Sequence, residues 1–432
     1  MRKLDHKMDS FVVHGGTRLE GEVRVSGAKN SALKLLAAAL LAEGTSRIGN
    51  VPEIADVHNM KAMLAHLGAA VAPYGDTGQA IEVPTELGQE TSAELAARLR
   101  ASLVLLGPLV TRTGRARLAQ PGGCNLGNRS IDMHLSGLTS MGADIQLGPD
   151  WIEVRAERLV GTEIDLEYAS VGAPENLMLA AVLAEGTTVI RNAAQEPEID
   201  DLAIFLQKMG ADIFRATSDE IVINGVDVLR PVDHWVIGDR IEAGTFAIAA
   251  AVTGGRVAVR GVDPVFLQLP LDKMAAAGVG IETDELSDGF VVDGGDDLVA
   301  TDVVTLPFPG CPTDMQALFV VLLSQAHGTS MVTENVYDDR FGVVAPLRTM
   351  GAEIELTGHH AIIRGPRRLR GAQVQASDLR AGAALVVAGL AARGTTIVTE
   401  PRHIDRGYAD FAGRLSALGA NVERTGTRAV AV

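Results

Sequence analysis

One of the two cysteines of this chain lies in a glycine-rich segment. Cys124 follows Pro121-Gly122-Gly123, and a short stretch separates it from Arg129. Glycines let the backbone bend sharply and expose its amides, and a nearby arginine favours the thiolate over the thiol. The segment therefore has the composition of a reactive-cysteine loop or of a phosphate-binding loop. The alternative interpretation is an ordinary turn that carries a small apolar side chain.

Basic residues also occur where helices are expected to begin. Lys29, Arg100 and Arg380 occupy such positions, where a cation opposes the positive end of the helix dipole. A bound anion would offset that repulsion, and the unpaired amides of a helix N-terminus bind anions in the same way. Other polar residues at these positions fit the role of ordinary N-caps. The sequence thus predicts an anion-binding cleft formed by helix N-termini.

The overall charge restricts the class of ligand. The chain has a net charge of −16 at pH 7. Nucleic-acid-binding proteins usually present a basic surface, so we expect no nucleic-acid partner. A small anionic ligand would instead be held by a local group of arginines.

Targeting segments and metal motifs are not evident in the sequence. No apolar run reaches the roughly 20 residues of a membrane span, and no apolar signal core follows the first residues. We therefore expect a cytoplasmic protein without a membrane partner. Two cysteines cannot form a disulfide framework, and no Cys/His cluster has the spacing of a zinc site. We expect neither a bound metal nor a cofactor.

A helix-ending phrase recurs six times, at intervals of about 70 residues. Each copy follows an amphipathic run and precedes a short strand-like stretch, which is typical of a helix, a C-cap glycine and a strand. The glycines of this phrase are Gly68, Gly142, Gly210, Gly278, Gly351 and Gly419. A second phrase lies upstream in the same units and contains Gly44, Gly186, Gly254, Gly328 and Gly394, and the second unit has only a weaker form of it, with Gly114. Each unit is predicted to contain a strand, a helix, a short strand, a helix and a closing hairpin.

The six units are too long for a single domain. A chain of 432 residues exceeds what one hydrophobic core usually organises. Hydrophobic residues make up 47% of the chain but aromatic residues only 4%, so the interior consists mainly of Ala, Val, Leu and Ile, which suits helices packed on sheets. We predict an α/β protein of two domains with three units each. The strand expected at Glu22–Ser26 would pair with the C-terminal units.

Five segments taken together resemble a known family. They are Ser26-Gly27-Ala28-Lys29-Asn30, Pro121-Gly122-Gly123-Cys124 with Arg129, Pro312-Thr313-Asp314-Met315-Gln316, Asp339-Arg340-Phe341 and His403-Ile404-Asp405-Arg406-Gly407-Tyr408. As a set they resemble UDP-N-acetylglucosamine 1-carboxyvinyltransferase, also called UDP-N-acetylglucosamine enolpyruvyl transferase, from Phe11 to Arg424. The related EPSP synthases of the shikimate pathway share the fold but begin with a lysine and serine signature that is missing here.

The resemblance implies a fold and a reaction. The fold would be a two-domain inside-out α/β barrel built from six repeats, three per domain, with one domain at 1–29 plus 238–432 and the other, carrying the Cys124 loop, at 30–237. Phosphoenolpyruvate and UDP-N-acetylglucosamine would bind between the domains, and closure would exclude water. The reaction would be the first committed step of peptidoglycan synthesis, without a cofactor. We expect a monomer or a weak homo-oligomer.

The resemblance also implies catalytic roles. Cys124 would protonate C3 of phosphoenolpyruvate, and Asp314 would accept the proton of the sugar 3-hydroxyl. Lys29 and Arg406, together with Arg129, would hold the phosphate. The Cys124 thiol would then be the target of an epoxide such as fosfomycin. The alternative for Asp314 is that it only caps a helix.

Further residues at family-matching positions are expected to bind the two substrates. For phosphoenolpyruvate these are Lys29, Asn30, Arg129, Arg340, Arg380 and Arg406. For UDP-N-acetylglucosamine these are Asn30, Arg100, Arg129, Ser130, Ile131, Asp132, Met133, Ser170, Val171, Gly172, Thr313, Asp314 and Val336. Any single arginine among them could instead form a surface ion pair. Glu196 and Glu198 lie in a further family motif, for which we expect interdomain support.

Some positions depart from the family pattern. Tyr168 stands where many relatives have Lys, Pro174 stands where Thr is common, and Ala55 and Val104 replace larger residues. These changes flank the expected phosphates of the nucleotide and leave the reacting centre intact. They leave open a paralogue that acts on another uridine nucleotide in secondary metabolism. A catalytically silent nucleotide-binding regulator would have no need of the acid, the base and the phosphate-binding cations together.

Overall fold

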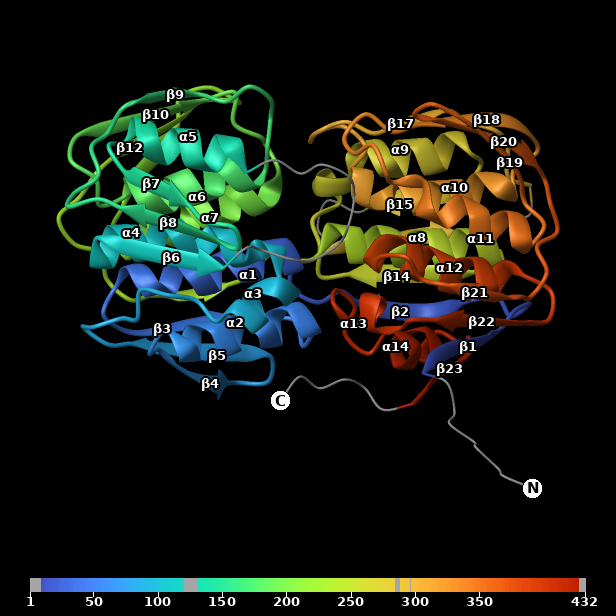
Figure 1. The fold of residues 1–432 in the computed structure, drawn as a ribbon. Coiled ribbons are helices and arrows are strands. Elements are labelled where there is room, and N and C mark those ends of the chain that lie inside the picture. The colour runs from blue at the N-terminus through green and yellow to red at the C-terminus, as the bar shows by residue number, and fades with distance from the viewer. Residues whose placement is uncertain (1–8, 120–130, 284–287, 296, 427–432) are drawn as a thin grey trace.

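Two lobes lie side by side in the fold (Figure 1). The structure is a computed structural model that describes residues 9–119, 131–283, 288–295 and 297–426. The terminal lobe has a buried apolar core drawn from residues 11–25 and 241–422, and the middle lobe has a core drawn from residues 28–236. Within the described ranges, no helix is both long and apolar enough to span a membrane.

The terminal lobe contains four-stranded sheets. In hydrogen-bonded order, one sheet consists of β21 (Gln373–Gln375), β22 (Thr395–Thr399), β1 (Ser10–His14) and β23 (Asn421–Thr425). A second consists of β15 (Gly280–Thr283), β16 (Gly289–Asp293), β14 (Arg256–Arg260) and β2 (Glu20–Arg24). A third consists of β17 (Val303–Val304), β18 (Gly328–Thr333), β20 (His360–Gly365) and β19 (Glu353–Thr357).

The helices of the terminal lobe alternate with these strands along the chain. The α-helices are α8 (Arg240–Thr253), α9 (Gln268–Ala276), α10 (Gln316–Ser324), α11 (Val344–Thr349), α12 (Leu379–Ala391), α13 (Arg402–Asp405) and α14 (Phe411–Ala417). Short 3₁₀ turns are η3 (Pro264–Leu267), η4 (Thr313–Met315) and η5 (Phe341–Val343).

The sheets of the middle lobe follow the same plan. One consists of β11 (Asp212–Arg215), β12 (Ile221–Asn224), β10 (Thr187–Arg191) and β9 (Glu163–Asp165), and another of β13 (Asp233–Trp235), β3 (Gly44–Gly49), β5 (Gly78–Val83) and β4 (Ala70–Tyr74). The remaining sheet consists of β6 (Arg115–Ala119), β8 (Trp151–Arg155) and β7 (Asp144–Leu147), and an isolated parallel bridge between Glu90 and Arg117 extends its edge.

The middle lobe has its own set of helices. They are α1 (Lys29–Ala38), α2 (Ala55–His66), α3 (Ala93–Arg98), α4 (Leu106–Thr113), α5 (Asp132–Ser140), α6 (Gly172–Ala181) and α7 (Pro197–Met209), with 3₁₀ turns η1 (Ala39–Leu41) and η2 (Arg100–Leu105).

Two glycine turns recur along the backbone. The six helix-ending glycines have φ between 91° and 105°, and the six upstream glycines have φ between 62° and 114°. Both ranges belong to the left-handed region that favours glycine, so the same two turns recur in every unit. Unit four, for example, runs from β13 through α8, β14 and α9 to the hairpin of β15 and β16.

Apolar helices occupy the interior of each lobe. Helix α10 is buried along its whole length, and in the terminal lobe it contacts α8 and α12, which are buried along most of theirs. A helix that is apolar on all sides must be surrounded by protein, which is why the sheets lie on the outside (Figure 1). The chain is thus an α/β protein in which the most apolar helices, such as α8, α10 and α12, are buried.

The strand that precedes the first helix of one lobe belongs, in two cases, to a sheet of the other lobe. Strand β2 pairs in parallel with β14 of the terminal lobe before the chain enters α1, and β13 pairs in parallel with β3 of the middle lobe before the chain enters α8. The prediction for Glu22–Ser26 was therefore wrong in its partner: the strand is β2 and pairs with unit four, because β1 already completes the C-terminal sheet with β22 and β23.

The segment between β2 and α1 and the segment between β13 and α8 meet at a pair of glycines. Gly27 and Gly238 form an antiparallel bridge. A Cβ atom would lie 1.8 Å from the carbonyl oxygen of Asn50 at Gly27, and 1.8 Å from that of Gly261 at Gly238. Only glycine allows the backbones to approach this closely, and the start of α1 is thereby fixed against both lobes.

Candidate active site

Two basic residues converge on one buried carboxylate. Lys29 is the first residue of α1, and its Nζ lies 2.6 Å from Oδ2 of Asp56 in the first turn of α2. Arg406 follows α13 in the terminal lobe and donates hydrogen bonds of 2.9 and 3.2 Å to the same carboxylate. The Asp56 side chain is 2% exposed, so water screens these charges little. Two of the predicted phosphate-binding cations therefore meet at one point between the lobes.

The two cations keep Asp56 ionised. Burial raises the pKa of the Asp56 carboxyl, but the charges of Lys29 and Arg406 outweigh burial and hold it below its usual value. Sequence reasoning did not single out Asp56, because an aspartate in the first turn of a helix is an ordinary helix-stabilising residue. Its function as the partner of Lys29 and Arg406 depends on a contact between residues far apart in the chain.

Asp314 lies between two arginines. It belongs to η4, and its Oδ1 and Oδ2 accept hydrogen bonds from Arg340 at 2.5 Å and from Arg380 at 2.9 Å. Both guanidinium groups are buried, whereas the Asp314 side chain is 25% exposed. Burial raises the pKa of the Asp314 carboxyl, but the two arginine charges outweigh burial and lower it strongly. Asp314 is thus a carboxylate at neutral pH, with part of its surface open to solvent.

Arg380 is held on several sides. The Asp378 side chain caps α12 by accepting from the amide of Arg380 at 2.9 Å. The Arg380 guanidinium donates to the hydroxyl of Tyr408 at 3.3 Å, and that hydroxyl lies 2.8 Å from Oγ1 of Thr245. Burial lowers the pKa of Arg380, but the charge of Asp314 outweighs burial and raises it. The repulsion expected between Arg380 and the helix dipole is therefore offset within the protein by carboxylates.

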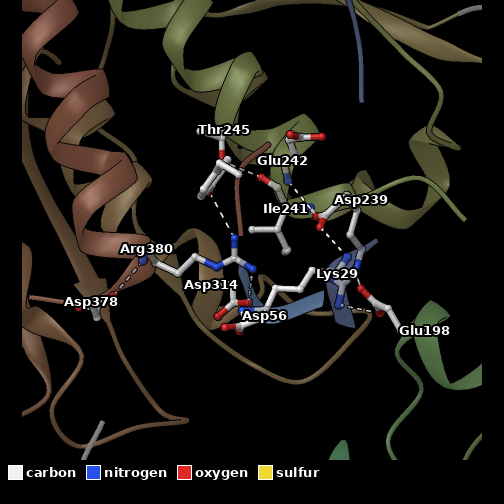
Figure 2. A network of polar contacts seen from close by, with 12 residues as sticks. Lys29, Asp56, Glu198, Asp239, Ile241, Glu242, Thr245, Asp314, Asp378 and Arg380 are labelled. Carbon is white, nitrogen blue, oxygen red and sulfur yellow. Dashed lines mark hydrogen bonds and ion pairs between the residues drawn. The ribbon is translucent and has the colours of Figure 1, made fainter. Parts of the chain in front are cut away.

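Asp239 links the two carboxylate centres (Figure 2). Its side chain caps α8 by accepting from the amides of Ile241 and Glu242, and it also accepts the amide of Lys29 at 3.1 Å. Asp239 lies in the segment between β13 and α8, so one residue orients the starts of α8 and of α1. Thr245 donates to the carbonyl oxygen of Ile241 at 2.7 Å and contacts the Tyr408 hydroxyl to which Arg380 also donates. The cations on Asp56 and on Asp314 thus belong to one polar network.

Glu196 and Glu198 join the lobes, as expected for interdomain support. Glu198 of the middle lobe accepts from Arg240 of the terminal lobe at 3.0 and 3.3 Å. Glu196 accepts the amide of Phe308 at 3.1 Å. Burial raises the pKa of the Glu196 carboxyl. Both contacts hold segments that lie close in sequence to Asp239 or Asp314.

A second polar group surrounds the start of α6 in the middle lobe. A side chain at Gly172 would lie 3.4 Å from the ring of His134, and Nδ1 of His134 lies 3.2 Å from Nδ2 of Asn176. Burial, with the charges of Arg100 and Lys34, lowers the pKa of His134 to about 4. The imidazole is therefore neutral at pH 7 and stands beside two cations at a helix N-terminus.

A buried ion pair links α1 to α6 near this group. Nζ of Lys34 lies 3.0 Å from Oε2 of Glu175, whose side chain has no exposed surface. Burial raises the pKa of the Glu175 carboxyl to about 7, although the charge of Lys34 acts against this. Neither residue nor His134 was singled out from the sequence. A Lys and a Glu that are 141 positions apart give no local signal of pairing.

The other predicted substrate-binding residues lie within or next to the following elements. They are Asn30 in α1, Arg100 at the start of η2, Ile131 before α5, Asp132 and Met133 within it, Ser170, Val171 and Gly172 at the start of α6, Thr313 in η4 and Val336 after β18. Cys124, Arg129 and Ser130 lie outside the described residues. Among the described residues, no group of three or more His, Cys, Asp or Glu side chains could hold a metal ion.

The cations and carboxylates of the site could bind an anionic ligand and accept a proton. Lys29, Arg340, Arg380 and Arg406 are concentrated around two carboxylates within a protein of net charge −16. A ligand with two anionic groups could take over these cations, since each is already oriented by hydrogen bonds. The partly exposed Asp314 could then accept a proton from a bound hydroxyl.

Comparisons with known proteins give the same family at the level of sequence. A sequence model of the family EPSP synthase (3-phosphoshikimate 1-carboxyvinyltransferase) matches residues 13–415. The chain is 49% identical over 416 residues to the UDP-N-acetylglucosamine 1-carboxyvinyltransferase of Corynebacterium efficiens, covering 96% of this chain and 98% of the relative. It is 50% identical over 416 residues to the enzyme of the same name from Mycobacterium tuberculosis, covering 96% and 99%.

Solved structures share the fold. The enolpyruvyl transferase NikO from Streptomyces tendae superposes with a TM-score of 0.87 at 28% identity, covering 97% of this chain and 99% of that one. An EPSP synthase from Acinetobacter baumannii superposes with a TM-score of 0.76 at 19% identity, covering 97% and 100%, which is a likeness of fold alone. The match along nearly the whole chain to both sets means that this protein belongs to the EPSP synthase family and, within it, to the UDP-N-acetylglucosamine 1-carboxyvinyltransferases.

Proposed function

We propose that this protein transfers the enolpyruvyl group of phosphoenolpyruvate to the 3-hydroxyl of UDP-N-acetylglucosamine and releases phosphate. This is the first committed step of peptidoglycan synthesis and would take place in the cytoplasm. The observation that carries the proposal is the pair of carboxylates, Asp56 and Asp314, each held by two cations at positions that match the family. The shared name of relatives about half identical in sequence supports the acceptor.

The reaction is an addition followed by an elimination. The sugar oxygen attacks C2 of phosphoenolpyruvate while Asp314 accepts the hydroxyl proton, and Cys124 donates a proton to C3. This gives a tetrahedral intermediate with the sugar ether, the carboxylate and the phosphate on one carbon. A C3 proton then returns to the Cys124 thiolate, and cleavage of the C2–O bond to phosphate restores the double bond, while the proton held by Asp314 passes to the departing phosphate. The products are the enolpyruvyl ether and inorganic phosphate, so atoms and charges balance.

The cations explain how Asp314 becomes a competent base. Between Arg340 and Arg380 its pKa is strongly lowered, and a carboxylate of low pKa is a weak base. The carboxylate of phosphoenolpyruvate would engage the same arginines and reduce their hold on Asp314, which raises its pKa. Binding of the donor would thereby activate the base for the acceptor.

Lys29 and Arg406, with Arg129, would hold the phosphate of phosphoenolpyruvate. Since Asp56 already gathers Lys29 and Arg406, the phosphate would find two oriented cations that also stabilise the charge of the departing group. Asn30 and Thr313 would contact the sugar. Arg100, Ser130 to Met133 and Ser170 to Gly172 would bind the nucleotide, and Val336 the sugar side.

The fold that we propose is an inside-out α/β barrel in each of two domains, with three repeats per domain. The proposed boundaries are 1–29 plus 238–432 and 30–237, and they are supported by the two separate hydrophobic cores. We propose closure of these domains on the nucleotide, because Arg406 and Asp56 belong to different lobes. The enzyme would work without a cofactor, as a monomer or a weak homo-oligomer.

A second candidate keeps the chemistry but changes the acceptor. Tyr168, at a position where many relatives have Lys, is 55% exposed just before α6. Its phenol cannot supply the charge of a lysine to a nucleotide phosphate. The exposed Tyr168 is the observation that favours a paralogue acting on a different uridine nucleotide.

Release of inorganic phosphate tests both candidates. The protein is incubated with phosphoenolpyruvate and, in separate reactions, with UDP-N-acetylglucosamine, UDP-glucose and uridine monophosphate. The proposal expects release that depends on UDP-N-acetylglucosamine and exceeds the other reactions by at least about 100-fold in kcat/KM. Faster release with another uridine nucleotide would support the paralogue, and no release with any of them would leave the silent regulator.

A further inference from the structure

Glu334 is a buried carboxylate beside the candidate base. It follows the last residue of β18 and is 3% exposed. Its Oε2 accepts a hydrogen bond of 2.9 Å from Oγ1 of Thr313, the residue that precedes Asp314. Its Oε1 accepts the backbone amides of Val336 at 2.8 Å and of Tyr337 at 3.1 Å. One side chain therefore ties the η4 turn to the loop after β18.

The position of Glu334 is itself fixed by the backbone on both sides. Its amide donates to the carbonyl oxygen of His359 at 2.9 Å. The next amide, that of Asn335, donates to Oγ1 of Thr305 at 3.0 Å, and Thr305 is fully buried. The carboxylate thus acts from a rigid support, because its own main chain is anchored to the turn between β19 and β20 and to the segment after β17.

The contacts of Glu334 close a ring around Asp314. The amide of Tyr337 donates to Glu334, and the Cζ atom of Arg340 lies over the Tyr337 ring, 5.5 Å from its centroid. Arg340 in turn donates to Asp314. Asp314 is therefore held from one side through Thr313 and from the other through Tyr337 and Arg340, and Glu334 is where both paths meet.

We propose that Glu334 is a positioning residue for the transfer reaction, which sets the separation between the base Asp314 and the acceptor-side residue Val336. This inference rests on the proposed function. Glu334 does not transfer a proton, because its oxygens already accept bonds from one hydroxyl and two amides. Its action is geometric, and a displacement of about 1 Å at a catalytic group can lower a rate by about 100-fold.

Paired substitutions at Glu334 separate positioning from general stability. Glu334→Ala leaves two amides and the Thr313 hydroxyl without their acceptor, so we expect a loss in kcat of about 100-fold and a higher KM for UDP-N-acetylglucosamine. We expect the KM for phosphoenolpyruvate to rise by less than the KM for UDP-N-acetylglucosamine, because Glu334 is connected to Arg340 but to neither Lys29 nor Arg406. Glu334→Gln should retain most of the activity and an unchanged pH profile, since an amide oxygen still accepts from Val336 and Tyr337.

A buried carboxylate far from the site provides the matched control. Glu153 in β8 is also 3% exposed, and it pairs with Arg115 at 2.6 Å and with Arg155. Glu153→Ala should lower thermal stability while kcat and both KM values stay near those of the unmodified enzyme. If Glu334→Ala does not fold, Thr313→Val removes one of the three hydrogen bonds to Glu334 and should lower kcat by a smaller factor.

The outcomes are distinguishable from those of the proposed function. Equal kinetics for Glu334→Ala and Glu153→Ala would overturn the positioning role. So would a Glu334→Gln enzyme as slow as Glu334→Ala with an altered acid limb of its pH profile, because that result would assign proton transfer to Glu334. If the unmodified protein releases no phosphate, it is the proposed function that fails.

Discussion

Asp56 and Arg406 are 350 residues apart in sequence and are joined by two hydrogen bonds, of 2.9 and 3.2 Å. Asp56 belongs to the middle lobe and Arg406 to the terminal lobe, and Lys29 binds the same carboxylate at 2.6 Å. The carboxylate of Asp56 therefore holds two cations together at the boundary between the lobes. It connects the relative position of the lobes to the proposed phosphate site.

Asp56→Asn should weaken both stability and donor binding. The substitution leaves Lys29 and Arg406 close together without a compensating negative charge, and breaking a buried ion pair costs about 3 kcal/mol or more. We expect a fall of that size in the free energy of unfolding and a drop of about 10-fold or more in kcat/KM for phosphoenolpyruvate. Chemical denaturation and steady-state kinetics measure the two effects. The control is Glu163→Gln, which alters an exposed ion pair with Arg191; an equal effect there would contradict the specific role of Asp56.

Cys124→Asp should keep substantial turnover and lose inhibition by fosfomycin. A carboxylic acid can deliver a proton to C3 as a thiol does, but it does not react with the epoxide in the same way. Asp314→Ala should instead lower kcat by about 100-fold or more, because the sugar hydroxyl then loses its proposed proton acceptor. Rates with and without fosfomycin check both expectations. A Cys124→Asp enzyme as inactive as Asp314→Ala would refute proton donation as the main role of the thiol.

The stability of the middle lobe should depend on the protonation of His134. Its pKa is lowered from 6.5 to about 4 in the folded protein, so between these pH values the unfolded chain binds more protons than the folded one. Stability should therefore fall as the pH falls from about 6.5 towards 4, by up to about 3 kcal/mol. His134→Gln removes this titration. The free energy of unfolding of the variant minus that of the unmodified protein should therefore be larger at pH 5 than at pH 7.5. Chemical denaturation at both pH values tests this, and a difference independent of pH would contradict it.

The strand exchange between the lobes should depend on Gly27 and Gly238. Alanine at either position would place Cβ 1.8 Å from a backbone carbonyl oxygen, so backbone must shift. We expect each substitution to lower the free energy of unfolding by about 3 kcal/mol. Gly88→Ala is the matched control, because its Cβ would lie 3.4 Å from the nearest atom. Thermal unfolding of the three variants tests this expectation. Equal unfolding midpoints would show that the backbone at Gly27 and Gly238 tolerates a side chain.

The repeat and the fold class could be predicted from sequence because both rest on local signals. A glycine after a helix predicts a left-handed turn at any position in the chain. All twelve glycines of the two phrases adopt positive φ. The partner of strand β2 could not be predicted in this way. Its pairing with β14 depends on the strand exchange with β13, which leaves no mark within either segment.

The candidate site was predictable only for residues within recognisable motifs. Lys29, Asp314, Arg340 and Arg406 lie in such motifs, and Arg380 lies at an expected helix start. The structure brings them into one network. Asp56 and Glu334 were missed because each acts through contacts with distant segments. A carboxylate near a helix start or after a strand has many ordinary roles, and only the folded chain reveals its partners.

The most direct measurement follows the oxygen that bridges carbon and phosphorus in phosphoenolpyruvate. The protein is incubated with UDP-N-acetylglucosamine and phosphoenolpyruvate labelled with ¹⁸O at this position, and both products are analysed by mass spectrometry. The account predicts that the label leaves with inorganic phosphate and that the nucleotide gains an unlabelled enolpyruvyl group on its 3-oxygen. Label retained in pyruvate, or a nucleotide without the added group, would contradict enolpyruvyl transfer by addition and elimination.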